Sequence, residues 1–210
     1  FRSSQIRMLS IFSLIASSIQ ESGFTAALVT RKEVTHKDYN AVFWFNISIS
    51  LCLYLVLFLC APLIADFYKT PELKSLARYA FTGFVIASLG ISHSAYLQRN
   101  LMIKQRSLSM VIGVTISGIA GVTLAYLGFS YWGYATQGIV YVAVNTACNW
   151  YFSSWRPTFE FNLAPIKQMF GFSGKLLITN IFNHINNNLF SVILGKFYTE
   201  KEVGYYNQAN

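Results

Sequence analysis

The chain has 210 residues, of which 54% are hydrophobic and 11% are charged, and its formal net charge is +8. Soluble domains usually carry about 25% charged residues, and the apolar residues here form runs that are too long for a soluble core. The basic residues lie mostly between these runs, and no zinc-finger spacing or RNA-binding aromatic motif occurs. The pattern argues against nucleic acid as a partner and favours contact with membrane lipids.

Six segments have the length and apolar character of membrane-spanning helices. A spanning α-helix needs about 20 predominantly apolar residues. In chain order the predicted spans are 6–29, 39–65, 73–97, 108–127, 131–154 and 174–197. The predicted fold class is therefore all-α, a polytopic membrane protein with six transmembrane helices in this chain.

The polar breaks between the spans predict the orientation. They lie at 31–38, 66–72, 98–106, 128–133 and 155–173. The loops after the first, third and fifth spans carry more Lys and Arg than the opposite side, so we expect them to be cytoplasmic. The first span then runs inward, which predicts a helix before it, and we interpret the chain as a piece of a longer protein. Within 155–173 we expect an interfacial amphipathic turn.

Four charged residues inside or at the ends of spans are candidates for a transport site, because charges in a bilayer usually face protein or a watery cavity. Glu21 is a cavity-lining carboxylate that pairs with a cation or carries protons, or else it is a partner in a structural pair or a helix-end residue in the headgroup zone. Lys175 begins the sixth span, where it attracts phosphate or extends to the headgroups. Arg78 and Arg99, at opposite ends of the third span, face the same two alternatives.

The sixth span carries a stripe of polar side chains. Its members share one helical face through i, i+3, i+4 and i+7 spacing, and they are Asn180, Asn183, His184 and Asn187. Two interpretations remain open for this asparagine stripe. It lines a hydrated pathway and hydrogen-bonds sugar hydroxyls, or it joins helices through interhelical amide bonds.

No pattern for a metal, a cofactor or a catalytic centre is present. His93 stands alone among small residues, and a packing face is the simpler interpretation. The three cysteines lie in apolar runs without a CxxC pair. Walker, GxSxG and dinucleotide-binding motifs do not occur. We therefore expect no catalytic residues, no metal and no cofactor.

Several runs, taken together, carry a resemblance to a known family. They are Glu-Ser-Gly-Phe-Thr-Ala-Ala-Leu-Val at 21–29, and the runs at 40–46, 61–68, 97–100, 154–157, 193–198 and 204–209. Across nearly its whole length the chain resembles the polysaccharide transporter family of the multidrug/oligosaccharidyl-lipid/polysaccharide exporter superfamily. That family includes bacterial O-antigen and capsule repeat-unit flippases.

The resemblance implies two pseudo-symmetric six-helix lobes around a central cavity. Residues 1–160 would be family helices two to six of the first lobe, with the first helix missing. Residues 161–210 would be an interfacial segment and the truncated first helix of the second lobe. The implied substrate is a polyprenyl-pyrophosphate-linked oligosaccharide, flipped by alternating access in the bacterial inner membrane beside polysaccharide assembly machinery. Phe190 stands where many members have Asp, so a role for that carboxylate does not transfer.

Two alternatives belong to other functional classes. A cation-coupled multidrug exporter of the same superfamily would have a more acidic cavity. Glu21 is the one residue that fits this alternative, and it supports it weakly. A membrane polysaccharide polymerase or acyltransferase would need a large outer loop with catalytic or sugar-binding residues, and the predicted outer loops are short.

Overall fold

The structure is a computed structural model that describes residues 23–67, 72–160 and 164–167, together with positions 171, 174, 175, 179 and 182. The regular structure within these residues is helical. The helices are α2 (Gly23–Thr30), α3 (His36–Phe67), α4 (Glu72–Arg99), α5 (Ile103–Tyr126) and α6 (Ser130–Phe152).

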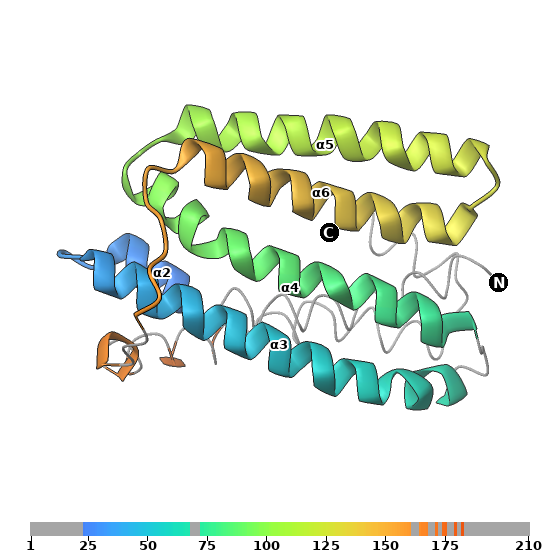
Figure 1. The fold of residues 1–210 in the computed structure, drawn as a ribbon, viewed down its shortest axis with the longest axis horizontal. Coiled ribbons are helices and arrows are strands. Elements are labelled where there is room, and N and C mark those ends of the chain that lie inside the picture. The colour runs from blue at the N-terminus through green and yellow to red at the C-terminus, as the bar shows by residue number, and fades with distance from the viewer. Residues whose placement is uncertain are drawn as a thin grey trace.

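The four long helices lie side by side in the order α3, α4, α6, α5 (Figure 1). Helix α4 is central, because it packs against α3 on one side and α6 on the other, and the short α2 contacts it near its C-terminal end. Helices α5 and α6 form an antiparallel hairpin. The spatial order therefore differs from the chain order, since α5 follows α4 in sequence but packs chiefly on α6.

The predicted second to fifth spans correspond to α3, α4, α5 and α6 with shifts of a few residues. Three of the described helices are long and apolar enough to cross a membrane: His36–Leu63, Lys74–Arg99 and Ile103–Tyr126. Helix α6 has the length but carries several amide, tyrosine and tryptophan side chains, and it is not among these three. Most of the predicted first and sixth spans lies outside the described residues.

The break predicted at 98–106 is much shorter in the structure. Helix α4 runs to Arg99 and α5 begins at Ile103. The turn is a Schellman motif, in which Met102 N–H donates to the Leu97 carbonyl at 2.9 Å and Leu101 N–H to the Gln98 carbonyl at 3.2 Å. Polar residues occupy the terminal turns of both helices. A prediction based on polarity alone therefore assigned these turns to the loop and made the loop too long.

Small residues allow α4 to approach α6 closely. A Cβ added at Gly90 would lie 2.8 Å from Thr146 Oγ1 and 3.3 Å from Thr146 Cα. Ser88, Ser92 and His93 on the same helix are fully buried. This agrees with the small-residue packing face predicted around His93, because small side chains let two helix backbones come together.

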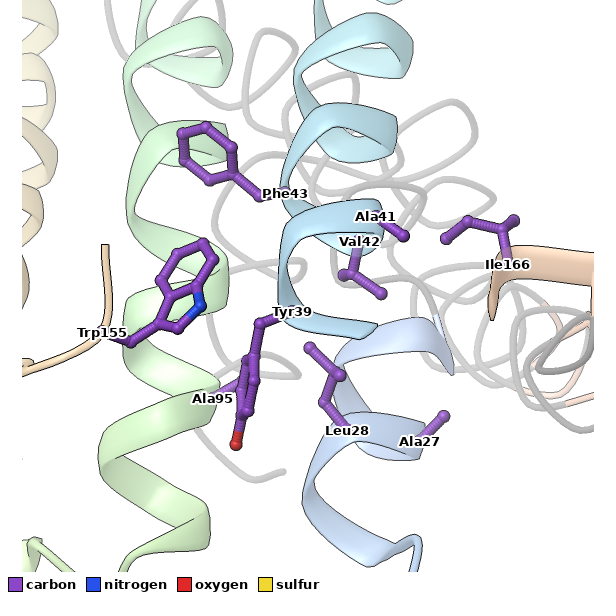
Figure 2. Close-up of a cluster of buried hydrophobic side chains, with 9 residues drawn as sticks. All are labelled: Ala27, Leu28, Tyr39, Ala41, Val42, Phe43, Ala95, Trp155 and Ile166. Carbon is purple, nitrogen blue, oxygen red and sulfur yellow. The ribbon is translucent and has the colours of Figure 1, made fainter. Parts of the chain in front are cut away.

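Two apolar clusters hold the bundle at its two ends. One joins α2, α3, α4 and the segment after α6 (Figure 2), and its buried members are Ala27, Leu28, Tyr39, Ala41, Val42, Phe43, Ala95, Trp155 and Ile166. The other joins α3 to α4 and consists of Ala61, Ala65, Leu76, Ala77 and Phe81. Outside these clusters α3 exposes a stripe of leucines at i, i+4, i+8 and i+12, namely Leu51, Leu55, Leu59 and Leu63. A stripe of that kind suits contact with lipid.

Candidate functional site

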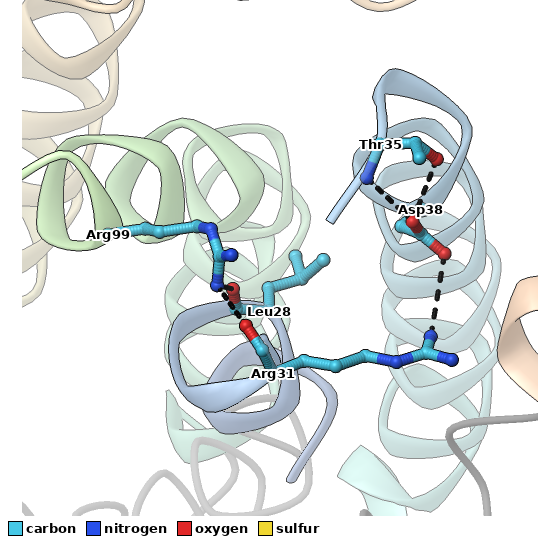
Figure 3. A network of polar contacts seen from close by, with 5 residues as sticks. All are labelled: Leu28, Arg31, Thr35, Asp38 and Arg99. Atoms are coloured by element: carbon cyan, nitrogen blue, oxygen red, sulfur yellow. Dashed lines mark hydrogen bonds and ion pairs between the residues drawn. The ribbon is translucent and has the colours of Figure 1, made fainter. Parts of the chain in front are cut away.

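The guanidinium of Arg99, the last residue of α4, binds the C-terminal end of α2 (Figure 3). Its Nη1 donates to the carbonyl oxygens of Leu28 at 3.1 Å, Val29 at 3.2 Å and Arg31 at 2.5 Å, and its Nη2 donates to Lys32 at 2.9 Å. The last carbonyls of a helix have no partner within the helix and carry partial negative charge. The guanidinium of Arg99 therefore caps the C-terminal end of α2.

The charged loop at 31–38 is an ordered turn. Asp38 Oδ2 accepts hydrogen bonds from the Thr35 backbone N–H at 2.7 Å and from its hydroxyl at 2.8 Å. This places a capping interaction at the start of α3, where a carboxylate in the first turn is favourable. Arg31 Nη1 lies 3.7 Å from Asp38 Oδ1 and completes an ion pair across the turn (Figure 3).

Residues 153–160, here called the strap, run back from α6 over the start of α3. The side-chain amide of Asn40 accepts from the Thr158 N–H at 2.9 Å and donates to the Glu160 carbonyl at 2.7 Å. Trp44 Nε1 donates to the Thr158 carbonyl at 2.8 Å, and the Thr158 hydroxyl lies 3.2 Å from His36 Nε2. Four hydrogen bonds thus tie the strap to the first turns of α3.

An aromatic cluster lies beneath the strap. Trp155 packs at ring-centroid distances of 5.8 Å from Tyr39, 5.8 Å from Phe43 and 5.0 Å from His93. The His93 ring lies 4.3 Å from that of Trp150, and neither of its nitrogens has a hydrogen-bond partner in the part of the chain that the structure describes. His93 is therefore packed as a ring among aromatic side chains. Within the described residues no group of three or more His, Cys, Asp or Glu could hold a metal ion.

The structure does not bring the two candidate arginines together. Arg78 and Arg99 are separated along α4 by about 30 Å, because an α-helix rises 1.5 Å per residue. The Arg78 guanidinium carbon lies 3.9 Å from the centre of the Phe58 ring, a cation–π contact between α4 and α3. Lys175 is exposed. The remaining candidates lie outside the described residues, and they are Glu21, Asn180, Asn183, His184 and Asn187.

A half-open cavity lined by both polar and apolar side chains, which the sequence did not indicate, lies between α2, α4 and α5. Its volume is about 430 Å³, and its polar lining consists of Thr25, Thr30, Ser94, Gln98 and Arg106. A neighbouring cavity of about 490 Å³ shares Gln98 and Arg106 with it. In the sequence Arg106 counted only toward the positive charge of a loop. Its position in the first turn of α5 depends on the early start of that helix.

The family model described as "Polysaccharide biosynthesis protein" matches residues 5–210. The chain belongs to this family. The match confirms the resemblance drawn from the sequence runs.

Curated relatives agree with the family. The chain is 29% identical to the teichuronic acid biosynthesis protein TuaB of Bacillus subtilis, over 93% of this chain and 41% of the relative. It is 26% identical to the lipopolysaccharide biosynthesis protein WzxC of Escherichia coli, over 93% and 40%. It is also 26% identical to the succinoglycan biosynthesis transport protein ExoT of Rhizobium meliloti, over 90% and 38%.

The chain spans about two fifths of the length of these curated relatives. No solved structure gives a significant match. The family match and the three helices long and apolar enough to span a bilayer identify this chain as part of a multi-pass membrane protein.

Proposed function

We propose that the full-length protein is a transporter that moves lipid-linked oligosaccharide repeat units across the bacterial inner membrane. The observation that carries the proposal is the family match over residues 5–210. One relative is named as a transport protein, and others are named for the biosynthesis of teichuronic acid or lipopolysaccharide. The activity is movement of a substrate rather than bond-making chemistry, and it serves surface polysaccharide biosynthesis.

The proposed architecture extends the described bundle. Residues 1–160 supply five helices of a first six-helix lobe, and residues 161–210 supply an interfacial segment and the first helix of a second lobe. Six spans lie in this chain, and the turn between α4 and α5 faces the cytoplasm. The two lobes rock about a central cavity, so that the cavity opens to one side of the membrane at a time.

Some of the candidate site residues have partners within the protein, and the others remain candidates for contact with substrate. The Arg99 guanidinium is bonded to four carbonyls, so we assign it to closing α2 and not to attracting substrate. Arg78 holds α4 against α3 through Phe58. Lys175 and the asparagine stripe remain the candidates to contact pyrophosphate and sugar hydroxyls, with Glu21 as a candidate for coupling. The polyprenyl chain stays in lipid.

A genetic experiment tests the transported substrate. The full-length gene is deleted in its host, and the lipid-linked oligosaccharides of the membrane are extracted and measured. We expect completed repeat units to accumulate while the amount of surface polysaccharide falls. The full-length gene should return both quantities to their wild-type levels. A matched strain that lacks the first glycosyltransferase of the locus should lose the polysaccharide without accumulating repeat units. Loss of polysaccharide with no accumulation in the transporter deletion would contradict the proposal.

A further inference from the structure

Arg99 and Arg106 flank the turn between α4 and α5, yet their environments differ. The guanidinium of Arg99 is bonded to four carbonyl oxygens. Within the described residues the side chain of Arg106 has no hydrogen bond or ion pair, and its Nε is buried without a partner. A buried donor left unpaired costs free energy. An unpartnered buried donor in a native structure calls for an explanation, and a bound anion is one that fits a guanidinium.

A second unpartnered polar atom belongs to the same cavity. Thr25 lines the 430 Å³ cavity with Arg106, and the Thr25 hydroxyl is buried with no hydrogen-bond partner in the described part of the chain. Gln98, on α4, contributes an exposed amide to the same lining. Donors from three helices therefore meet at one cavity, while the apolar side chains of Val29 and Ile91 form part of its wall.

The charge of the cavity is positive. Among its described lining residues none is Asp or Glu, and Arg106 supplies a full positive charge. The adjoining N-terminus of α5 adds partial positive charge, because its first N–H groups have no helical partner and Met102 provides no side-chain cap. A guanidinium with nearby hydroxyl and amide donors matches the oxygens of a phosphate group.

The geometry points to a phosphate-binding site in which Arg106, Thr25 and Gln98 hold the phosphate of a membrane amphiphile. The mixed lining suits a molecule with a phosphate and an apolar stem. Two sources share this chemistry: an anionic phospholipid headgroup and a polyprenyl phosphate. The site lies between helices of the first lobe; the polyprenyl source rests on the proposed function, whereas the phospholipid source does not.

A binding experiment on the purified full-length protein in detergent tests the site. The probes are farnesyl pyrophosphate, dispersed phosphatidylglycerol and inorganic pyrophosphate, with farnesol as the uncharged control. The variants are Arg106→Gln, which removes the charge, and Thr25→Val, which removes the hydroxyl at nearly constant volume. Lys104→Gln is the matched control, because Lys104 is exposed in the same turn of α5 and lines neither cavity. Thermal unfolding of each variant is measured alongside.

The expected result is that a phosphate-bearing probe binds the wild-type protein and farnesol does not. Arg106→Gln should weaken that binding about tenfold or more, since a charge-assisted hydrogen bond contributes on that scale. Thr25→Val should weaken it less, and Lys104→Gln should change it less than twofold. Tighter binding of farnesyl pyrophosphate than of phosphatidylglycerol would identify a polyprenyl phosphate as the ligand of the site. Tighter binding of phosphatidylglycerol would identify an anionic phospholipid.

Two results would overturn the inference. One is that no phosphate probe binds the wild-type protein. The other is that Lys104→Gln weakens binding as much as Arg106→Gln and Thr25→Val do. If Arg106→Gln unfolds, Thr25→Val decides, and unchanged binding in that variant counts against the site. Binding is measured without transport, so failure of this site is separable from failure of the proposed function.

Discussion

The guanidinium of Arg99 lies 2.5 Å from the carbonyl oxygen of Arg31, 68 residues earlier in the chain. The contact joins the end of the central helix α4 to the turn that leads from α2 into α3. Three further carbonyls of the same turn and helix end accept from the same side chain. One cation thereby joins the end of α4 to the end of α2 and to the turn that precedes α3.

Replacing Arg99 by Ala should destabilise the protein by about 1–3 kcal/mol, because hydrogen bonds to a charged group contribute on that scale and four carbonyls lose their donor. Arg99→Lys should recover part of the loss, since an ammonium keeps the charge but not the planar fork. The thermal unfolding midpoint in detergent reports both changes. Lys104→Ala, at an exposed position, is the control, and an equal shift in that variant would contradict the role given to Arg99.

Changing Asn40 to Asp should release the strap from α3. Asp keeps an acceptor for the Thr158 N–H but loses the donor that reaches the Glu160 carbonyl, where a carboxylate would repel the oxygen. Limited proteolysis of the purified protein should then cut within 153–160 faster than in the wild type. Asn100→Asp is the matched control, because that exposed amide bonds only its own helix. Equal cleavage rates in Asn40→Asp and Asn100→Asp would count against the strap.

Leu101 and Gly128 occupy equivalent positions in the two turns beside α5, with φ of 54° and 88°. The second turn is also a Schellman motif, closed by Phe129 N–H to the Leu124 carbonyl at 3.0 Å. An L side chain in this conformation costs roughly 1–2 kcal/mol, which Gly avoids. Leu101→Gly should therefore stabilise the protein by about 0.5–1 kcal/mol, and Gly128→Ala should destabilise it by about 1 kcal/mol. A fall in the unfolding midpoint for Leu101→Gly would show that its side chain makes contacts that outweigh the strain.

The sequence was sufficient for the long helices, because about 20 consecutive apolar residues in a bilayer protein have few other folds available. It was not sufficient for the ends of α4 and α5, where polar side chains suit both a loop and a helix terminus. Nor could it reveal the partners of Arg99 or Asn40. The periodicity of a helix shows which face is apolar, whereas the carbonyls that these side chains bind lie 67–71 and 120 positions away.

The candidate site also contains residues that the sequence could indicate and residues that only the packing of the helices reveals. Arg99 was selected because a charge at the end of a membrane span is costly unless it is solvated or paired, and the structure supplies carbonyl partners within the protein. Arg106 received no role because its cavity is formed by three helices, and no local spacing predicts which side chains meet there. Burial without a partner becomes visible only when the helices are packed.

The proposed orientation predicts opposite labelling of the two turns beside α5. In a full-length protein whose cysteines are replaced by Ala, Lys104→Cys should react with a membrane-impermeant thiol reagent only after cells are permeabilised. Phe129→Cys should react in intact cells. Both positions are exposed, so access to the reagent reports the side of the membrane. The reverse labelling would place the α4–α5 turn outside and overturn the proposed orientation.

The most direct measurement of the proposed function is translocation in reconstituted vesicles. The full-length protein is placed in vesicles that carry a fluorescent lipid-linked oligosaccharide, and an impermeant glycosidase is added outside. We expect the enzyme to digest the oligosaccharide of both leaflets when the protein is present, and only that of the outer leaflet in protein-free vesicles. Asn183→Leu together with Lys175→Ala should slow the digestion of the inner pool. Digestion limited to the outer leaflet in both preparations would contradict the proposal.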